Sequence, residues 1–239
     1  MKIITVPGSN AMDEMKRLLG QRASTGLHPV LFGSKDSADF IYKGSLGVKD
    51  PAAIIAESLQ IDVAKLIAEF YHPDEWEDGR EEDEQAEEEW IMDESDSEAG
   101  EDDVETGDDD ELDLSSAKQG RKLLETVHIG LLEIAQPWQV FAHLGWGDEN
   151  TGGQDIWGSA MNCAIHRRWQ EEWGAEVVAL QETVIECFVA RPPLTRRDAM
   201  RLAREQYYYC SDIVHQGVGS IPELADTLMG YNQSYFWWD

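Results

Sequence analysis

Three residues whose side chains could perform chemistry together lie within one short stretch near the C-terminus, Cys210, Asp212 and His215. A thiolate nucleophile needs a base and an orienting acid within hydrogen-bond reach, so these residue types could form the centre of a cysteine-dependent hydrolase or transferase. The alternative is structural. In that case the thiol is a small buried group behind a tyrosine-rich helix, and Asp212 pairs with His215 to fix the glycine turn that follows. We favour the structural alternative, because most isolated cysteines are not catalytic.

Two further pairs of residues have spacings that are found in functional sites. Cys163 and His166 are three residues apart on one face of a predicted helix, where they could chelate a metal. Two ligands do not complete a site, and no second pair stands at a suitable spacing, so we predict no metal and no cofactor. Glu182 and Glu186 could act as acid and base, but alternate strand positions near solvent explain them more simply.

Tryptophan is concentrated in the second half of the chain, where seven of the nine lie between Trp138 and Trp238. Core packing accounts for most of them. Trp146 lies in a glycine-rich loop, and neighbouring strand residues such as Trp237 and Trp238 point to opposite faces. We therefore expect Trp146 and one of the adjacent pair to be exposed, as tryptophans at interfaces often are, and we add Gln216 to the candidate binding residues.

The negative charge of the chain is confined to one stretch. The net charge is −29, and residues 74–113 contain 24 Asp or Glu and one basic residue, which leaves 24 acidic and 18 basic residues, a net charge of −6, elsewhere. Residues 73–115 are predicted to form a disordered acidic linker, because the stretch cannot bury enough apolar surface to offset chain entropy. Trp76 and Trp90 are the exceptions. An apolar anchor among carboxylates can bind a basic, grooved partner in a salt-sensitive manner.

The composition excludes several classes of partner. No basic stripe is available to neutralise phosphates, which argues against nucleic acid and against an anionic membrane surface. The sequence has no apolar run of about 18 residues, which a spanning helix requires. The first residues do not resemble a signal peptide, and three widely spaced cysteines do not form a disulfide framework. We predict a cytoplasmic protein whose partner is another protein, and its oligomeric state stays open.

The pattern of apolar residues and helix caps predicts an α+β fold with a mostly antiparallel sheet and packed helices. Residues 1–72 are predicted to form a small α/β region and residues 116–239 a C-terminal α+β domain. The predicted strands cover residues 2–6, 28–33, 127–135, 138–144, 175–180, 184–190 and 234–238. Predicted helices follow Asn10 (with Gly20 as the stop), Ser34 or Asp36, Asp50, Asp155, Thr195 and Ser220, with further helical segments at residues 61–71 and 117–126.

Several long motifs of the C-terminal part point to one family. They are the segment that starts at Trp138, the helix end RRWQEEWGAEVV, the stretch VARPPLTRRDAMRLAREQYYYCSDIVHQGVGSIPELADTLMG and the terminal YFWWD. On these motifs, residues 123–239 resemble the bacterial domain-of-unknown-function family 4253, and residues 28–33 could belong to the same module. The family's Gly-Gly-Trp-Asn-x-Cys-Pro loop is replaced here by Gly145–Asn150, which lacks the Cys-Pro. The resemblance therefore identifies a domain without implying an activity.

These observations favour an interaction module over an enzyme, because no convincing catalytic set is present. The most concrete hypothesis is an immunity-type or regulatory protein that holds a basic partner, with the acidic stretch steering the association. Two alternatives stay open. One is the cysteine-dependent hydrolase or transferase centred on Cys210, and the other is an acidic, chaperone-like binder of basic proteins.

Overall fold

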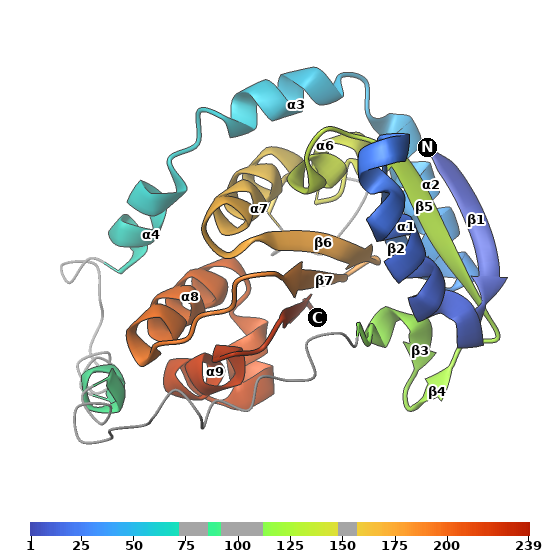
Figure 1. Cartoon of the computed structure of the whole chain (residues 1–239). Helices are drawn as coiled ribbons and strands as arrows, with labels where there is room; N and C mark the ends of the chain where they lie inside the picture. The colour runs from blue at the N-terminus through green and yellow to red at the C-terminus, as the bar shows by residue number, and fades with distance from the viewer. Residues whose placement is uncertain (72–85, 92–111, 148–156) are drawn as a thin grey trace.

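The computed structural model describes residues 1–71, 86–91, 112–147 and 157–239. Most of the predicted linker 73–115, with Trp76, lies outside the described residues. Within the linker, residues 86–91 are helical and residues 112–115 lead into the second ordered part of the chain. The described parts form one central sheet with helices on both faces (Figure 1).

The central sheet contains six strands in the order β1-β5-β2-β6-β7-β8. Every neighbouring pair is antiparallel except β2 and β6, which run parallel. This arrangement confirms the predicted α+β class with a mostly antiparallel sheet. The strand bounds are Lys2–Pro7 (β1), Leu27–Gly33 (β2), Thr126–Glu133 (β5), Ala175–Leu180 (β6), Val184–Val189 (β7) and Gln233–Trp237 (β8).

Strand β5 links the two ends of the sequence. Both of its neighbours, β1 and β2, come from the first 33 residues, and β2 in turn pairs with β6 through Leu31 and Ala179. Strand β2 is buried from His28 to Gly33, as expected for a central strand with apolar side chains on both faces. Residues 1–71 and 112–239 therefore share one sheet.

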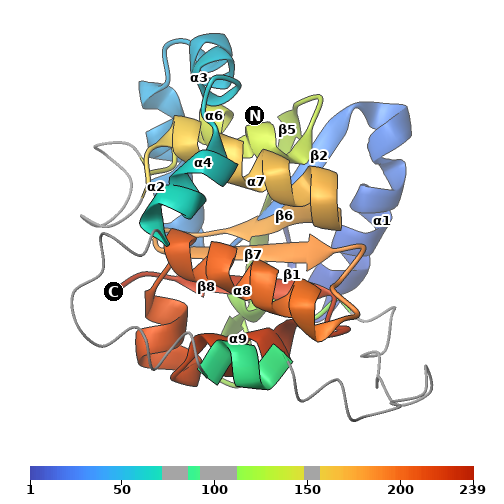
Figure 2. The same ribbon diagram turned by 90° about the vertical axis from the view of Figure 1, so that its left-hand side faces the viewer.

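The helices form unequal layers on the two faces of the sheet. On one face, α1 (Ala11–Thr25) and residues 112–117 cover a smaller core. On the other face, the remaining helices enclose the main core, and α3 and α4 arch over α7 (Figures 1 and 2). Their bounds are Lys35–Gly47 (α2), Pro51–Ser58 (α3), Val63–Phe70 (α4), Val140–Leu144 (α6), Ser159–Trp173 (α7), Arg196–Tyr209 (α8) and Ile221–Leu228 (α9).

Side-chain caps fix where several helices begin. Ser34, Thr195 and Ser220 each accept a hydrogen bond from the backbone amide three residues on, which satisfies one of the free donors of a first helical turn. Pro51 occupies the first turn of α3, where its missing N–H costs nothing. These four predicted helix starts are confirmed.

Three predicted segments are wrong. Residues 138–144 are helical, as the 3-10 turn Pro137–Gln139 and α6, because an apolar run that is buried on all sides has no strand periodicity to distinguish it from a helix. Residues 117–126 form the small hairpin of β3 (Lys118–Gln119) and β4 (Lys122–Leu123), whose turn contains Gly120 at φ 60°. Helix α1 continues through Gly20 and ends at Gly26.

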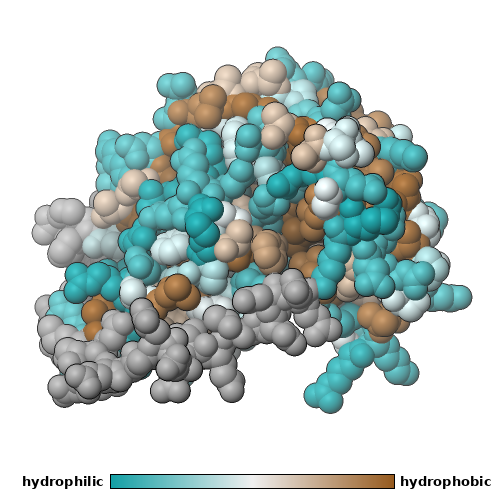
Figure 3. Space-filling model, viewed as in Figure 1, coloured by the Kyte–Doolittle hydropathy of each residue, from teal (hydrophilic) through white to brown (hydrophobic). Residues whose placement is uncertain are grey.

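The outer surface seen in Figure 3 is mostly hydrophilic, with hydrophobic side chains scattered over it, including some along α3. Three stretches complete the described elements. They are a 3-10 turn at Gly8–Asn10, a 3-10 turn at Ser115–Ala117 and a π-helix at Ile213–Val218.

Candidate functional site

The thiol of Cys210 is buried at the end of α8. Its side chain is 1% exposed, and Sγ donates a hydrogen bond to the Trp237 carbonyl at 3.0 Å. Burial raises the pKa of the Cys210 thiol to about 12, because the thiolate would lose its hydration. At neutral pH the group is a protonated thiol that joins α8 to β8.

The two proposed helpers of Cys210 have other partners. The Asp212 carboxylate accepts a hydrogen bond from the Asp239 amide at 3.3 Å, and the exposed His215 ring lies 3.1 Å from the Tyr207 hydroxyl. Among the described residues, no hydrogen bond runs between the side chains of Cys210, Asp212 and His215. The predicted Asp212–His215 pair is therefore also wrong. Gln216 lies exposed in the π-helix next to His215.

Trp146 is buried, which corrects the prediction that the glycine loop presents it. Its ring is 0% exposed, packs against Phe141 and Trp238, and donates from Nε1 to the Gln181 carbonyl at 2.7 Å. Gly147, at φ 89°, turns the chain inward at this point, and a Cβ there would lie only 1.9 Å from the Trp157 carbonyl oxygen.

The adjacent tryptophans at the C-terminus, Trp237 and Trp238, differ in burial. Trp238 is 5% exposed and belongs to the main core, so it is not an exposed anchor. Trp237 is half-buried, with its ring 5.5 Å from that of Tyr235. Of the predicted C-terminal anchors, Trp237 is the one that reaches the surface.

A buried polar cluster surrounds His166. The His166 ring is 3.3 Å from the Tyr209 hydroxyl and 3.7 Å from Cys187 Sγ, and the Tyr209 hydroxyl donates to Asn162 at 2.5 Å. Burial lowers the pKa of His166 to about 3 and raises the pKa values of Cys187 and Tyr209. All of these groups are therefore neutral at pH 7, and their hydrogen bonds satisfy polar atoms that are buried in the core.

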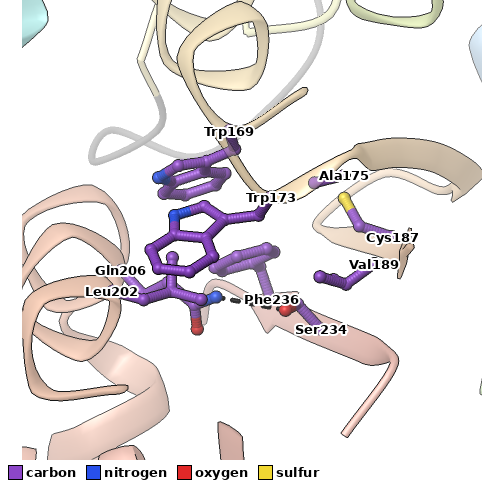
Figure 4. Close-up of a pocket in the computed structure, with 9 residues that line it drawn as sticks. All are labelled: Trp169, Trp173, Ala175, Cys187, Val189, Leu202, Gln206, Ser234 and Phe236. Carbon is purple, nitrogen blue, oxygen red and sulfur yellow. Dashed lines mark hydrogen bonds between the residues drawn. The ribbon is translucent and has the colours of Figure 1, made fainter. Parts of the chain in front are cut away.

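The cavity beside this cluster is too small for a substrate. Its volume is about 10 Å³, close to what one water molecule needs. It lies between α7, α8, β7 and β8, and the amide of Gln206 donates across it to the hydroxyl of Ser234 at 3.1 Å (Figure 4). Among the described residues, no group of three or more side chains is arranged to hold a metal ion.

Glu186 lies in the interior, contrary to the expectation that it faces solvent near Glu182. Its carboxylate is 4% exposed and accepts hydrogen bonds from the Ser115 and Ser116 amides at 2.8 and 2.7 Å. Burial raises its pKa, because the ionised form loses hydration. Glu182 instead accepts a hydrogen bond from Ser37. Glu186 therefore fastens the end of the acidic stretch to β7.

The described helical turn 86–91 lies against α8, as both ribbon views show (Figures 1 and 2). Glu87 is 4% exposed and forms an ion pair with Arg204. The guanidinium of Arg196 lies 4.7 Å from the centre of the Trp90 ring and donates to the Trp90 carbonyl at 3.0 Å. A buried carboxylate and an aromatic face thus each bind one arginine.

Trp90 was predicted as a binding residue for a partner, but its contact with α8 was not predicted, and neither were Glu87, Arg196 and Arg204. The signal was present in part, because EEEW places carboxylates beside a ring and RRDAMRLAR places four arginines on one helix. No rule of local spacing pairs two segments that are more than 100 residues apart. The tertiary fold brings residues 86–91 and α8 together, and local sequence patterns do not predict such a contact.

Comparison with known families identifies the C-terminal part of the chain. Residues 128–239 match the family described as "Domain of unknown function (DUF4253)", which confirms the resemblance for this part. The match does not extend to residues 28–33. Searches of curated proteins and of solved structures found no match. Of the helices that the structure describes, none is long and apolar enough to cross a membrane.

Proposed function

We propose that this protein is a cytoplasmic interaction module, of immunity or regulatory type, that holds a basic partner through the acidic residues of the 73–115 stretch. One observation carries the proposal. Glu87 and Trp90, in the described part of that stretch, bind Arg204 and Arg196 of the same chain. Arginines of a partner would meet the same carboxylate and aromatic chemistry.

The distribution of charge supports the same partner. Residues 74–113 carry 24 acidic residues and Arg80, a net charge of −23, within 40 residues. A field of one sign raises the rate at which an oppositely charged partner arrives and weakens with added salt. Such steering suits a module that must capture a basic protein quickly.

The competing functions make different demands. A cysteine-dependent hydrolase or transferase needs an accessible thiolate, whereas burial raises the pKa of Cys210 to about 12. An acidic, chaperone-like binder needs the same charge as a specific partner-binding module but would accept many unrelated basic proteins. The breadth of binding therefore separates the chaperone-like function from the proposed one.

The first test uses a fluorescein-labelled peptide with the sequence of residues 194–207, which presents four arginines. Its binding to the full chain is measured by fluorescence anisotropy at 50 and 300 mM NaCl. We expect binding that weakens with salt and is lost when the acidic residues of 93–111 are replaced by Asn and Gln. The matched control peptide carries Gln at each arginine. Equal binding of both peptides, or no effect of neutralising residues 93–111, would contradict the proposal.

The second test addresses specificity. The full chain and the neutralised variant are used as bait in cells that produce the protein, and the retained proteins are identified by mass spectrometry. We expect one basic protein that the wild type retains and the variant loses. Retention of many unrelated basic proteins would support the chaperone-like function instead.

A further inference from the structure

An open groove of about 480 Å³ lies between α4 and α8, away from the buried cluster around His166. Its apolar lining comes from Ile67 and Ala68 of α4, from Met200 of α8 and from Ile91 of the 86–91 turn. This volume falls within the range of pockets that hold a ligand or a peptide side chain and its neighbours. The groove is not used by the proposed binding of a basic partner.

The polar residues of the groove include four arginines. Arg168, Arg197, Arg201 and Arg204 line it together with Asp198 and Glu205. Three of these arginines have carboxylate partners, because Arg168 pairs with Glu205, Arg201 with Glu172 and Asp198, and Arg204 with Glu87. The positive charge available to the carboxylate of a ligand is therefore centred on Arg197.

The arginines of the groove differ in how firmly they are held. Arg168 binds the buried Glu205, which also accepts from Trp169 Nε1 at 2.9 Å, so this arginine is fixed in the wall. Arg201 lies at the surface with Glu172 and Asp198. Arg197 is exposed and forms no ion pair with any residue that the structure describes. Arg197 and Arg201 are therefore the arginines that an incoming carboxylate can reach.

We propose that this groove binds an acidic amphipathic segment of a partner protein. Its apolar side chain packs between Ile67 and Ile91, and its carboxylates pair with Arg197 and Arg201. Two observations support this occupant, which are the exposed positive charge of Arg197 and the neighbouring 86–91 turn, whose carboxylate and aromatic ring bind arginines of the same helix α8. An amphipathic helix in a groove between two helices is a common mode of peptide recognition.

The test uses a fluorescein-labelled peptide with the sequence of residues 84–93, EQAEEEWIMD, titrated with the full chain in an anisotropy assay. Two substitutions probe the groove. Arg197→Gln removes its most accessible cation, and Ala68→Glu puts a negative charge on its exposed α4 wall. We expect each to weaken peptide binding about tenfold, the usual size of a lost charged hydrogen bond.

Matched controls lie outside the groove. Arg121→Gln removes an exposed arginine of the β3–β4 hairpin, and Ala56→Glu adds the same charge to the exposed face of α3. We expect both to leave binding unchanged within about twofold, because they alter only long-range, screened electrostatics. A circular dichroism spectrum equal to that of the wild type shows that each variant is folded.

Three outcomes would overturn the proposal. They are the absence of peptide binding to the wild type, equal losses in the groove variants and their controls, and a loss of binding in the further variants Arg196→Gln and Arg204→Gln without any loss in Arg197→Gln and Ala68→Glu. The last outcome would mean that the probe replaces the 86–91 turn instead of entering the groove. Because this probe is acidic and the one for the basic partner is arginine-rich, either proposal can fail while the other stands.

Discussion

At the residue scale, the three free cysteines share one property, which is burial. Cys163, Cys187 and Cys210 are each at most 1% exposed, and burial raises the pKa values of Cys187 and Cys210. A thiol in this state behaves as a small apolar group. The cysteines therefore contribute packing to the core.

The first prediction concerns their reactivity. In the native protein at pH 8, the Cys210 thiolate is about a thousandfold scarcer than that of an ordinary exposed cysteine, since its pKa is about 12 instead of about 8.5. We expect iodoacetamide to label none of the three cysteines under native conditions and all of them in urea, as measured by mass spectrometry. Cys210→Ala assigns the signal. Rapid labelling of native Cys210 would restore the enzyme hypothesis.

The second prediction concerns His166 and pH. Its pKa is about 3 in the folded protein and about 6.5 in the unfolded chain, so between these values only the unfolded chain binds the proton. The free energy of unfolding therefore falls with acidification, by about 2 kcal/mol from pH 7 to pH 5 for this group alone.

Urea denaturation at both pH values measures that loss. His166→Phe, which suits the surrounding aromatic rings, is expected to unfold with about 2 kcal/mol less pH dependence than the wild type. The exposed His215→Gln serves as the control and should retain the wild-type dependence. An unchanged pH dependence in His166→Phe would show that His166 is not the group responsible.

At the element scale, β2 and the returning chain approach each other closely at Gly33. This glycine has φ 76°, and a Cβ on it would lie 2.4 Å from the Ser116 carbonyl oxygen and 2.5 Å from Gln181 Nε2. Gly26 has a similar φ of 68°, with nothing within 4 Å of the same position. Alanine at position 26 would therefore introduce backbone strain alone, whereas alanine at position 33 would introduce both backbone strain and a steric clash.

The third prediction compares alanine at these two positions. Gly26→Ala is expected to lower the free energy of unfolding by about 1 kcal/mol, because only the left-handed backbone is unfavourable for alanine. Gly33→Ala has the same backbone cost and must also displace backbone atoms, so we expect the free energy of unfolding to fall by at least about 3 kcal/mol. Thermal or urea denaturation measures both. Equal losses would indicate that the segment 112–117 can move away from β2 at little cost.

Some of these elements could be predicted from the sequence and others could not. The starts of α2, α8 and α9 were predictable because a cap acts within three residues of itself. Helix α6 was not, because Val140–Leu144 is buried on nearly every side, which erases helical periodicity. The burial of Trp146 and the Arg204–Glu87 pair depend on distant segments, so local patterns carry no information about them.

At the scale of the whole molecule, the sheet depends on residues that the matched family domain does not include. The match begins at residue 128, inside β5, whose two neighbours β1 and β2 lie within residues 1–33. Without them, β5 has no strand to pair with, and β6 loses one of its two neighbours. Strand pairing thus makes the first 33 residues part of the same folded unit.

The fourth prediction follows from this arrangement. A fragment of residues 112–239 is expected to lack the dispersed amide NMR spectrum of a folded protein. In this fragment, the backbone groups of β5 and those on the edge of β6 that pairs with β2 would have no partner strand. The matched control is the full chain cut at a protease site introduced between residues 93 and 111, which keeps every strand present. We expect the cut protein to retain the native spectrum. A folded 112–239 fragment would contradict the prediction.

The anchoring of the chain on both sides of residues 92–111 has a consequence for evolution. Ile91 is half-buried and packs against the main core, and on the far side Leu114 is buried and Glu186 accepts hydrogen bonds from Ser115 and Ser116. Loop residues added between two such fixed points would cost only the entropy of closing a longer loop, about 0.6 kcal/mol for each doubling of loop length. Selection can therefore vary the length and the number of charges of this segment while the sheet stays intact.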